Sequence, residues 1–237
     1  MKATPIVWDE KLVIKFWDYY SQYPELYFTY QFGGNIVNVL SQYVKPGGAI
    51  LDYGCGTGFI IKHFVSKGFE TYGADTSFQS VEFVNKQYKG EPNFKGAYLL
   101  DDLFKLNKKF DVIFVVEVIE HLTDEFLVPL VENVKKLGTA GSKIVFTTPN
   151  NERLDESVVY CPVCEHTFHR WQHVRSWNIQ SLTSFMEKHG LKVDNCFATD
   201  FSSIPPEGML KKLKHSVRKF FYSTSQPHLV AICSIRD

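Results

Sequence analysis

Residues 50–59 read Ile-Leu-Asp-Tyr-Gly-Cys-Gly-Thr-Gly-Phe, and this stretch decides the fold. Its apolar beginning is typical of a buried strand, and an apolar-rich helical pattern follows it. Between them Gly54, Gly56 and Gly58 carry no side chains, so the backbone can turn tightly and approach a ligand. Such a turn between a strand and a helix indicates a binding site for a nucleotide-type ligand. The spacing differs from the Gly-x-Gly-x-x-Gly of dinucleotide-binding turns, since Phe59 stands where that pattern has its last glycine.

Strands and helices alternate along the chain on both sides of this turn. Apolar runs that predict strands lie at 49–53, 70–74, 94–99, 110–116, 143–148, 191–198 and 229–235. Helical patterns lie near 57–67, 77–88, 123–137 and 178–189. This alternation predicts right-handed crossovers and a mostly parallel sheet with helices on both faces. The fold class is therefore α/β.

Length and composition fit one domain of this class. The 237 residues are 44% hydrophobic and 22% charged, which excludes a disordered or collagen-like chain. Lys plus Arg and Asp plus Glu number 26 each, so no global field recruits nucleic acid or a membrane. No apolar run reaches the roughly 20 residues that span a bilayer, and the first residues lack the apolar stretch of a signal peptide. Five cysteines, an odd number, favour reduced thiols, and we expect a cytoplasmic protein.

We divide the chain into four parts of a single domain, 1–237. These are a helical N-terminal lid (1–45), a cofactor-binding core (46–149), a Cys/His insertion (150–177) and a basic insertion (199–227). Ten aromatic residues lie between Trp8 and Phe32. Rings of this kind either pack helices onto the core or cover a bound ligand.

An acidic residue, Asp75, ends the strand after the glycine turn. A carboxylate at that place accepts ribose hydroxyls in nucleoside-binding sites. The turn and Asp75 together resemble class I S-adenosylmethionine-dependent methyltransferases, over about residues 46–150. The resemblance implies a Rossmann-like, doubly wound sheet of seven mostly parallel strands, with 229–235 antiparallel in the edge region. It places the glycine turn at the methionine part of the cofactor, Asp75 at the ribose and Asp101 or Asp102 at the adenine. The full set of implied cofactor contacts is Asp52, Gly54, Cys55, Gly56, Gly58, Asp75, Thr76, Asp101, Asp102 and Glu117.

Glu117, Glu120 and His121 follow the fourth strand of the core. The carboxyl ends of such strands face the ligand crevice, so we expect these side chains to contact a substrate. On a helical turn they share one face, which suits a divalent cation. The alternatives are that His121 is a general base, or that the glutamates cap a turn and His121 packs. We assign His121 and Glu117 as the catalytic candidates.

The same string resembles two groups of methyltransferases. One is the ubiquinone-pathway O-methyltransferases and related small-molecule enzymes, and the other is the small-RNA 2′-O-methyltransferases. The second resemblance implies that Glu117, Glu120 and His121 bind a metal together with a later histidine, here His173.

Cys161, Cys164, His169 and His173 form the pattern Cys-x2-Cys-x4-His-x3-His. Two thiolates and two imidazoles are the ligands of a closed tetrahedral zinc site, and we predict a structural zinc that orders the insertion. His166 is a substitute ligand. The alternatives are a metal-free loop of packed thiols and surface histidines, or a catalytic or redox site. The pattern is similar to insertions in bacterial methyltransferases of the sugar and surface-glycan type.

A basic amphipathic stretch at 209–221 carries five Lys and Arg residues. It predicts a helix with a solvated basic face. Peripheral contact with an anionic membrane, or recognition of a phosphate, are the alternatives.

We therefore expect an enzyme that uses S-adenosylmethionine to methylate a small molecule, with a hydroxyl of a sugar or glycan precursor as the acceptor. One alternative is a metal-assisted 2′-O-methyltransferase of RNA, and another is a non-catalytic cofactor-binding subunit. Nucleic acid is not the expected partner, because the sequence carries no RNA-binding signature.

Overall fold

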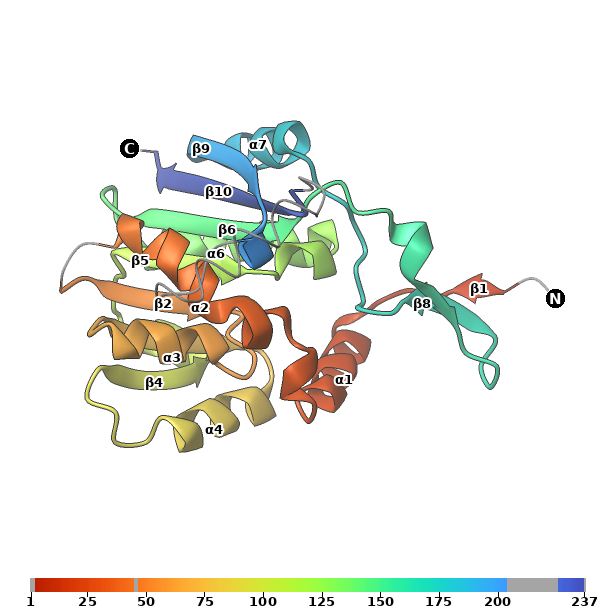
Figure 1. Ribbon diagram of the computed structural model, residues 1–237, viewed down its shortest axis with the longest axis horizontal. Helices are drawn as coiled ribbons and strands as arrows, with labels where there is room; N and C mark the ends of the chain where they lie inside the picture. The colour runs from red at the N-terminus through yellow and green to blue at the C-terminus, as the bar shows by residue number, and fades with distance from the viewer. Residues whose placement is uncertain (1–2, 45–46, 204–225, 237) are drawn as a thin grey trace.

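The computed structural model describes residues 3–44, 47–203 and 226–236, and a seven-stranded sheet forms its centre (Figure 1). In spatial order the strands are β4 (Phe94–Leu99), β3 (Glu70–Asp75), β2 (Ala49–Tyr53), β5 (Val112–Val116), β6 (Lys143–Pro149), β10 (His228–Ile235) and β9 (Leu191–Thr199). All pairs from β4 to β6 are parallel, whereas β10 runs antiparallel to both β6 and β9. The prediction of a seven-stranded, mostly parallel Rossmann-like sheet with an antiparallel strand in the edge region is confirmed.

Helices cover both faces of this sheet. One face carries α2 (Phe28–Leu40), α3 (Phe59–Ser66) and α4 (Phe78–Gln87), and the other carries α5 (Leu100–Lys105), α6 (Asp124–Leu137) and α7 (Ile179–Lys188). Successive side chains of a strand point to opposite faces. On β5, Ile113 and Val115 pack on the side of α5 to α7, while Phe114 stacks on Phe64 of α3. The strands are therefore buried on both sides, which is why they read as continuous apolar runs.

The order of the strands fixes the place of the ligand crevice. Strand β2 lies between β3 and β5, and the chain winds outward from it in both directions. Ligands of open α/β sheets bind beyond the carboxyl ends of the strands at such a switch point. The glycine turn follows β2, Asp75 ends β3 and Glu117 follows β5. The main candidate residues therefore gather at one edge of the sheet.

The expected N-terminal lid consists of two helices with different surroundings. Helix α2 belongs to the core, since Ile36, Val37 and Leu40 are fully buried. Helix α1 (Glu10–Tyr20) begins at Asp9, whose carboxylate accepts the backbone N–H of Leu12, and buries none of its residues. Unlike α2, α1 therefore contributes no buried side chain to the core.

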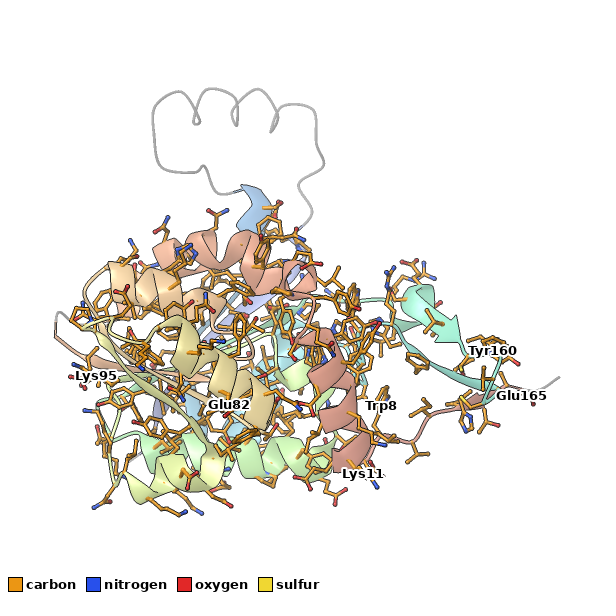
Figure 2. All side chains as sticks on the ribbon, turned by 90° about the horizontal axis from the view of Figure 1, so that it is seen from below. Trp8, Lys11, Glu82, Lys95, Tyr160 and Glu165 are labelled. Carbon is orange, nitrogen blue, oxygen red and sulfur yellow. The ribbon has the colours of Figure 1, made fainter. Side chains whose placement is uncertain are left out.

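Part of the expected Cys/His insertion forms a second, small sheet. Strands β7 (Val158–Tyr160) and β8 (His166–His169) make an antiparallel hairpin, and β1 (Thr4–Pro5) pairs with β8 in parallel. We call residues 158–169 the hairpin arm. The arm projects from the main body, with Tyr160 and Glu165 near its end (Figures 1 and 2).

The expected basic stretch at 209–221 lies outside the described residues. In the part of the chain that the structure describes, no helix has the length and apolar character needed to cross a membrane.

Candidate functional site

The turn after β2 has a backbone that requires glycine at three places. Gly54, Gly56 and Gly58 have φ angles of 80°, 49° and 76°, in the left-handed region that side chains disfavour. A Cβ atom on Gly54 would lie 2.7 Å from Cγ2 of Val118, and one on Gly58 would lie 2.9 Å from Cγ2 of Val84. The turn is therefore packed closely against its neighbours.

Asp75 ties this turn to the end of β3. Its carboxylate oxygens accept hydrogen bonds from the backbone N–H groups of Gly56 and Ser77, both at 2.8 Å. Burial raises the pKa of Asp75, and these amide donors oppose the rise. Asp75 and Thr76 line a cavity beside the turn, where the sequence predicted contacts to the cofactor.

Asp52 is a buried carboxylate with an unused oxygen. It is 2% exposed, and its Oδ2 has no hydrogen-bond partner among the described residues. Burial and the negative charge of Asp75 raise the pKa of Asp52 well above its usual range. Asp52 and the buried thiol of Cys55 both line the cavity. A donor group on a bound ligand would satisfy the free oxygen of Asp52.

Asp101 and Asp102, the predicted adenine contacts, lie outside the lining of the cavity. Both residues lie in the first turn of α5 and are exposed, and Asp102 pairs with Nζ of Lys105 at 2.7 Å. The cavity is lined there by Leu100 and by neither acid. Because α5 turns its apolar Leu103 into the core, its acidic side chains face solvent, where they stabilise the helix N-terminus.

A cavity of about 600 Å³ joins the glycine turn to the residues that follow β5. Gly54 and Gly56 of the turn, with Asp52 and Asp75, line one part of its wall. A second group of polar lining residues comprises Glu117, Glu120, His121, His173 and His228. Its wall also contains the aromatic rings of Trp17, Tyr20, Tyr27, Phe28, Phe126 and Trp171. A concave, largely apolar space with a few converging polar groups is typical of a small-molecule site.

Glu117 is held in an unusual backbone conformation at the end of β5. Its φ is 53°, and its N–H donates to the backbone oxygen of Thr147 at 3.1 Å. The hydroxyl of Thr147 in turn donates to Oε1 of Glu117 at 2.8 Å, while Oε2 lies 3.6 Å from Nδ1 of His228. Non-glycine residues in this region of φ gather at functional sites.

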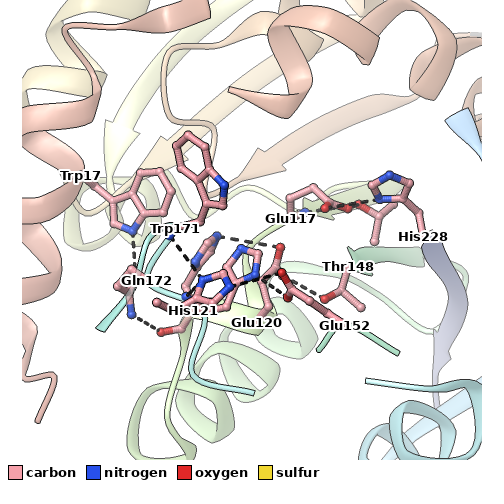
Figure 3. Close-up of polar contacts among 12 residues, drawn as sticks. Trp17, Glu117, Glu120, His121, Thr148, Glu152, Trp171, Gln172 and His228 are labelled. Atoms are coloured by element: carbon pink, nitrogen blue, oxygen red, sulfur yellow. Dashed lines mark hydrogen bonds and ion pairs between the residues drawn. The ribbon is translucent and has the colours of Figure 1, made fainter. Parts of the chain in front are cut away.

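Glu120 lies in a short 3-10 turn (Ile119–His121) and is only 1% exposed. Its Oε2 accepts the hydroxyl of Thr148 at 3.0 Å. Its Oε1 has no hydrogen-bond partner among the described residues and lies 3.8 Å from Nε2 of His121 (Figure 3). Burial, with the charge of Glu117 added, raises the pKa of Glu120 well above its usual range. A buried carboxylate oxygen of this kind calls for a cation or a proton.

His121 is enclosed by rings. Its imidazole lies edge-on to Trp17 and to His173, with ring centres 4.7 and 4.8 Å away. Burial, followed by the neighbouring charge of His173, lowers the pKa of His121 well below its usual range, so the ring is neutral near pH 7. Gln172 connects this site to α1, since it donates to the carbonyl of His121 at 2.8 Å and accepts from the indole N–H of Trp17 at 3.1 Å (Figure 3).

The two histidines of the HxxxH pattern, His169 and His173, differ in which ring nitrogen carries the proton. Nδ1 of His173 lies 2.5 Å from Oε2 of Glu152. A carboxylate accepts, so the proton of His173 is on Nδ1 and its Nε2 is free. Nδ1 of His169 accepts the backbone N–H groups of Trp171 and His173, so its proton is on Nε2, 3.4 Å from Oε1 of Glu152. Of the two, His173 is therefore the one prepared to bind a metal.

Two groups of possible metal ligands result within the described part of the chain. Glu120, His121 and His173 offer ligand atoms within 4.8 Å of one another, and so do Glu152, His169 and His173. The tautomer of His169 counts against the second group. The first group brings Glu120 and His121 together with His173, whereas Glu117, which the resemblance also placed among the ligands, is not in it.

The predicted four-ligand zinc site does not form. Cys161 and Cys164 lie at the tip of the hairpin arm, where the N–H of Cys161 donates to the carbonyl of His166 at 2.8 Å. His169 pairs with Val158 at the base of the arm. His169 lies three residues along β8 from His166, the residue opposite Cys161. Three residues of a strand span about 10 Å, too far for His169 and the cysteines to bind one ion. The spacing misled because the residues before His169 form a strand instead of a loop that could fold back.

Glu152, Gln172 and His228 belong to the site and were not predicted. Glu152 and Gln172 reach it through partners distant in the sequence, and His228 lies on β10 near the end of the chain. No local pattern marks them; the only signal is that His228 directly precedes the last predicted strand, 229–235.

Comparison with known proteins agrees with this geometry. A family model described as a methyltransferase domain matches residues 26–195. The ubiquinone biosynthesis O-methyltransferase of Rickettsia canadensis is 35% identical over 95 residues, which cover 38% of this chain and 40% of that protein. The protein of the same name from Pelagibacter ubique is 32% identical over 126 residues, 52% of this chain and 50% of its own. The aligned part thus spans half or less of these curated relatives.

Among solved structures, an S-adenosylmethionine-dependent methyltransferase from Clostridium acetobutylicum superposes with a TM-score of 0.62 at 12% identity. The match covers 94% of this chain and 98% of that one, and it shows a common fold.

Proposed function

Because this chain belongs to the methyltransferase domain family, we propose that it transfers the methyl group of S-adenosylmethionine to a hydroxyl of a small-molecule acceptor. The observation that carries the proposal is the single cavity, with the glycine turn at its cofactor end and a group of acids and histidines also in its wall. Transfer from a sulfonium needs mainly alignment of acceptor oxygen, methyl and sulfur, which one cavity shared by cofactor and acceptor would allow.

For the cofactor, we assign the ribose to Asp75 and the methionine part to the glycine turn and Asp52. The second lone pairs of the Asp75 oxygens are available to hydroxyl donors, since each oxygen accepts one amide. The unpartnered Oδ2 of Asp52 suits the ammonium of the methionine part, because it is buried and anionic when paired with a cation. Thr76 and Cys55 complete this wall.

For the acceptor, we assign His121 and Glu117 to the reacting hydroxyl. A neutral imidazole can take the proton that the hydroxyl loses as its oxygen attacks the methyl carbon. The low pKa of His121 keeps it in this neutral form. Glu117 shares the cavity wall and is fixed by Thr147 and His228.

A second candidate is metal-assisted transfer, which the unpartnered Oε1 of Glu120 favours. Glu120, His121 and Nε2 of His173 would hold a divalent cation, and Glu152 would orient His173 through its Nδ1–H. When bound, such an ion would lower the pKa of a coordinated hydroxyl. The ligand set of one carboxylate and two imidazoles also accounts for the buried charge of Glu120.

The acceptor that we propose is a sugar or glycan precursor, as expected from the sequence. Aromatic rings in the wall stack on sugar rings as well as on phenols, and the two named relatives act in ubiquinone biosynthesis. A panel of acceptors must therefore include nucleotide sugars, simple phenols and a short RNA.

The test is transfer of radiolabelled methyl from S-adenosylmethionine to this panel, with and without EDTA, in the wild type and in Glu120→Gln. A general base predicts transfer that survives EDTA. Metal assistance predicts transfer that EDTA and Glu120→Gln both abolish and that added Mg²⁺ or Mn²⁺ restores only in the wild type. Asp102→Asn, on the solvent face of α5, is the matched control and should keep full activity. Cofactor binding without transfer to any acceptor would contradict the enzyme and favour a binding subunit, and transfer to RNA would contradict the small-molecule acceptor.

A further inference from the structure

The tip of the hairpin arm is a closed, fixed turn. Residues 161–165 connect β7 to β8, and the N–H of Glu165 donates to the carbonyl of Cys161 at 2.9 Å. Glu165 has a φ of 58°, which brings the chain back into β8. This turn places Cys161 and Cys164 at the outer end of the arm, the end that Tyr160 and Glu165 mark in Figure 2.

The two sulfurs of this turn are also accessible. Cys164 is exposed and Cys161 is partly exposed, so both sulfurs are open to an ion from solvent. Paired thiolates on a tight turn are ligands that zinc prefers.

The described part of one chain does not complete such a site. A structural zinc takes four ligands, yet among the described residues no group of three possible ligands includes either cysteine. The nearby His166 turns Nδ1 back onto the carbonyl of Cys164 at 2.5 Å. The remaining cysteines of the chain lie on the main body, and two of them, Cys55 and Cys233, are buried. The described residues thus leave two ligand positions of such an ion to another molecule.

The surface around the tip indicates what that molecule is. Val163 is 92% exposed, and Val158 and Tyr160, on one side of β7, are 51% and 47% exposed. Strand β7 is an edge of the small sheet, whose order is β1-β8-β7. Exposed apolar side chains beside an unpaired edge are typical of a contact surface. A second copy of the chain offers the same apolar tip with the same two thiols, and a twofold axis through the ion makes the contact self-complementary.

We propose that Cys161 and Cys164 form one half of a zinc site, which the same two cysteines of a second copy complete, so that the arms join two chains into a dimer. Four thiols bind one Zn²⁺ and release four protons, and no redox partner is required. The proposal is independent of the methyl transfer proposed above, because the arm tip does not line the cavity.

The experiment is native mass spectrometry and light scattering of the full chain, purified with zinc. We expect a dimer that carries one zinc at the tip for two chains. Replacement by Co²⁺ should give the strong sulfur-to-cobalt absorption of a four-thiolate site. Cys161→Ser and Cys164→Ser should each lose this ion and become monomeric, whereas Cys196→Ser, on β9, should keep both ion and dimer. Unchanged binding of S-adenosylhomocysteine will show that the serine variants are folded.

Glu120→Gln separates this ion from a cation in the cavity, since it should leave the cobalt–thiolate absorption unchanged. The proposal is wrong if the zinc-bearing protein is monomeric, if no zinc is bound at the tip, or if the dimer survives both serine substitutions. It is also wrong if His166→Ala, His169→Ala or His173→Ala removes the zinc, because the ligands would then come from one chain. A Cys161–Cys164 disulfide in protein purified with zinc and without oxidant would equally overturn it.

Discussion

Asp75→Asn is the sharpest test of the cofactor end of the site, because the change keeps the shape and removes the charge. Asp75 accepts one backbone N–H on each oxygen, from Gly56 and from Ser77. An asparagine keeps one oxygen and turns its NH₂ towards the other N–H, so one bond is lost and one donor is left unpaired. A hydrogen bond to a charged group contributes about 1.5–3 kcal/mol. Removal of a buried charge offsets part of this loss, and we expect a net fall of about 1–2 kcal/mol in the free energy of unfolding.

Cofactor affinity should fall further than stability does. The neutral side chain accepts a ribose hydroxyl less strongly, and the glycine turn loses one of its fixed points. We expect S-adenosylhomocysteine to bind about 10- to 100-fold more weakly, the equivalent of about 1.4–2.7 kcal/mol. Urea denaturation without ligand and calorimetric titration with S-adenosylhomocysteine measure the two effects separately.

Asp102→Asn is the matched control. It removes a carboxylate of the same size whose partner is the exposed Lys105, and surface ion pairs contribute about 0–1 kcal/mol. Its affinity for S-adenosylhomocysteine should equal that of the wild type. If Asp75→Asn also binds like the wild type, Asp75 does not hold the ribose, and if its unfolding is unchanged, the turn does not depend on the carboxylate.

Three further predictions concern the turn and the neighbouring group of acids and histidines. Gly58→Ala should lower the free energy of unfolding by about 2–4 kcal/mol, because its φ is left-handed and the added Cβ would lie 2.9 Å from Val84. Gly90→Ala, with a similar φ but open space around it, should lower it by only about 1–2 kcal/mol. Equal losses in urea denaturation would contradict a steric clash with Val84. His121→Ala should reduce turnover about 100-fold or more while S-adenosylhomocysteine binds within threefold of the wild type, and a lost affinity by calorimetry would instead place His121 at the cofactor. Because the pKa of His121 is lowered in the folded protein, the unfolded chain binds the proton first as pH falls below about 6.5, and the free energy of unfolding declines there by up to about 1.4 kcal/mol per pH unit for each such group. His121→Asn should therefore show a shallower decline in the urea midpoint between pH 6.5 and 5. A decline equal to that of the wild type would contradict the low pKa of His121.

The strands of the sheet could be predicted because a local sequence pattern marks each of them. Strand β2 is buried at all five positions, and strands of this kind read as unbroken apolar runs between turns. The glycine turn and Asp75 were predictable for a related reason, since both sit directly at strand ends. The exposure of Asp101 and Asp102 was not predictable, because the sequence did not reveal the short helix α5, which turns them towards solvent.

The group around His121 could be predicted only in part. Glu117, Glu120 and His121 are neighbours in sequence and in space. Their partners are distant in the sequence. Gln172 lies 51 residues from His121, whose carbonyl it binds, and 155 residues from Trp17, whose indole N–H it accepts. The Cys/His pattern failed for the opposite reason: its members are close in sequence, but an extended strand holds them apart.

The bond between Trp17 and Gln172 has a practical consequence for finding the acceptor. Of the four tryptophans, Trp17 and Trp171 stand in the wall of the cavity, and Trp17 lies against the ring of His121. Indole emission changes with local polarity and with contact to quenching groups, so a molecule entering the cavity alters the intrinsic fluorescence of the unlabelled protein. The variants Trp17→Phe and Trp171→Phe would show how much of the fluorescence change comes from each of these two tryptophans. A chemical library can therefore be screened optically before any product of methyl transfer is known.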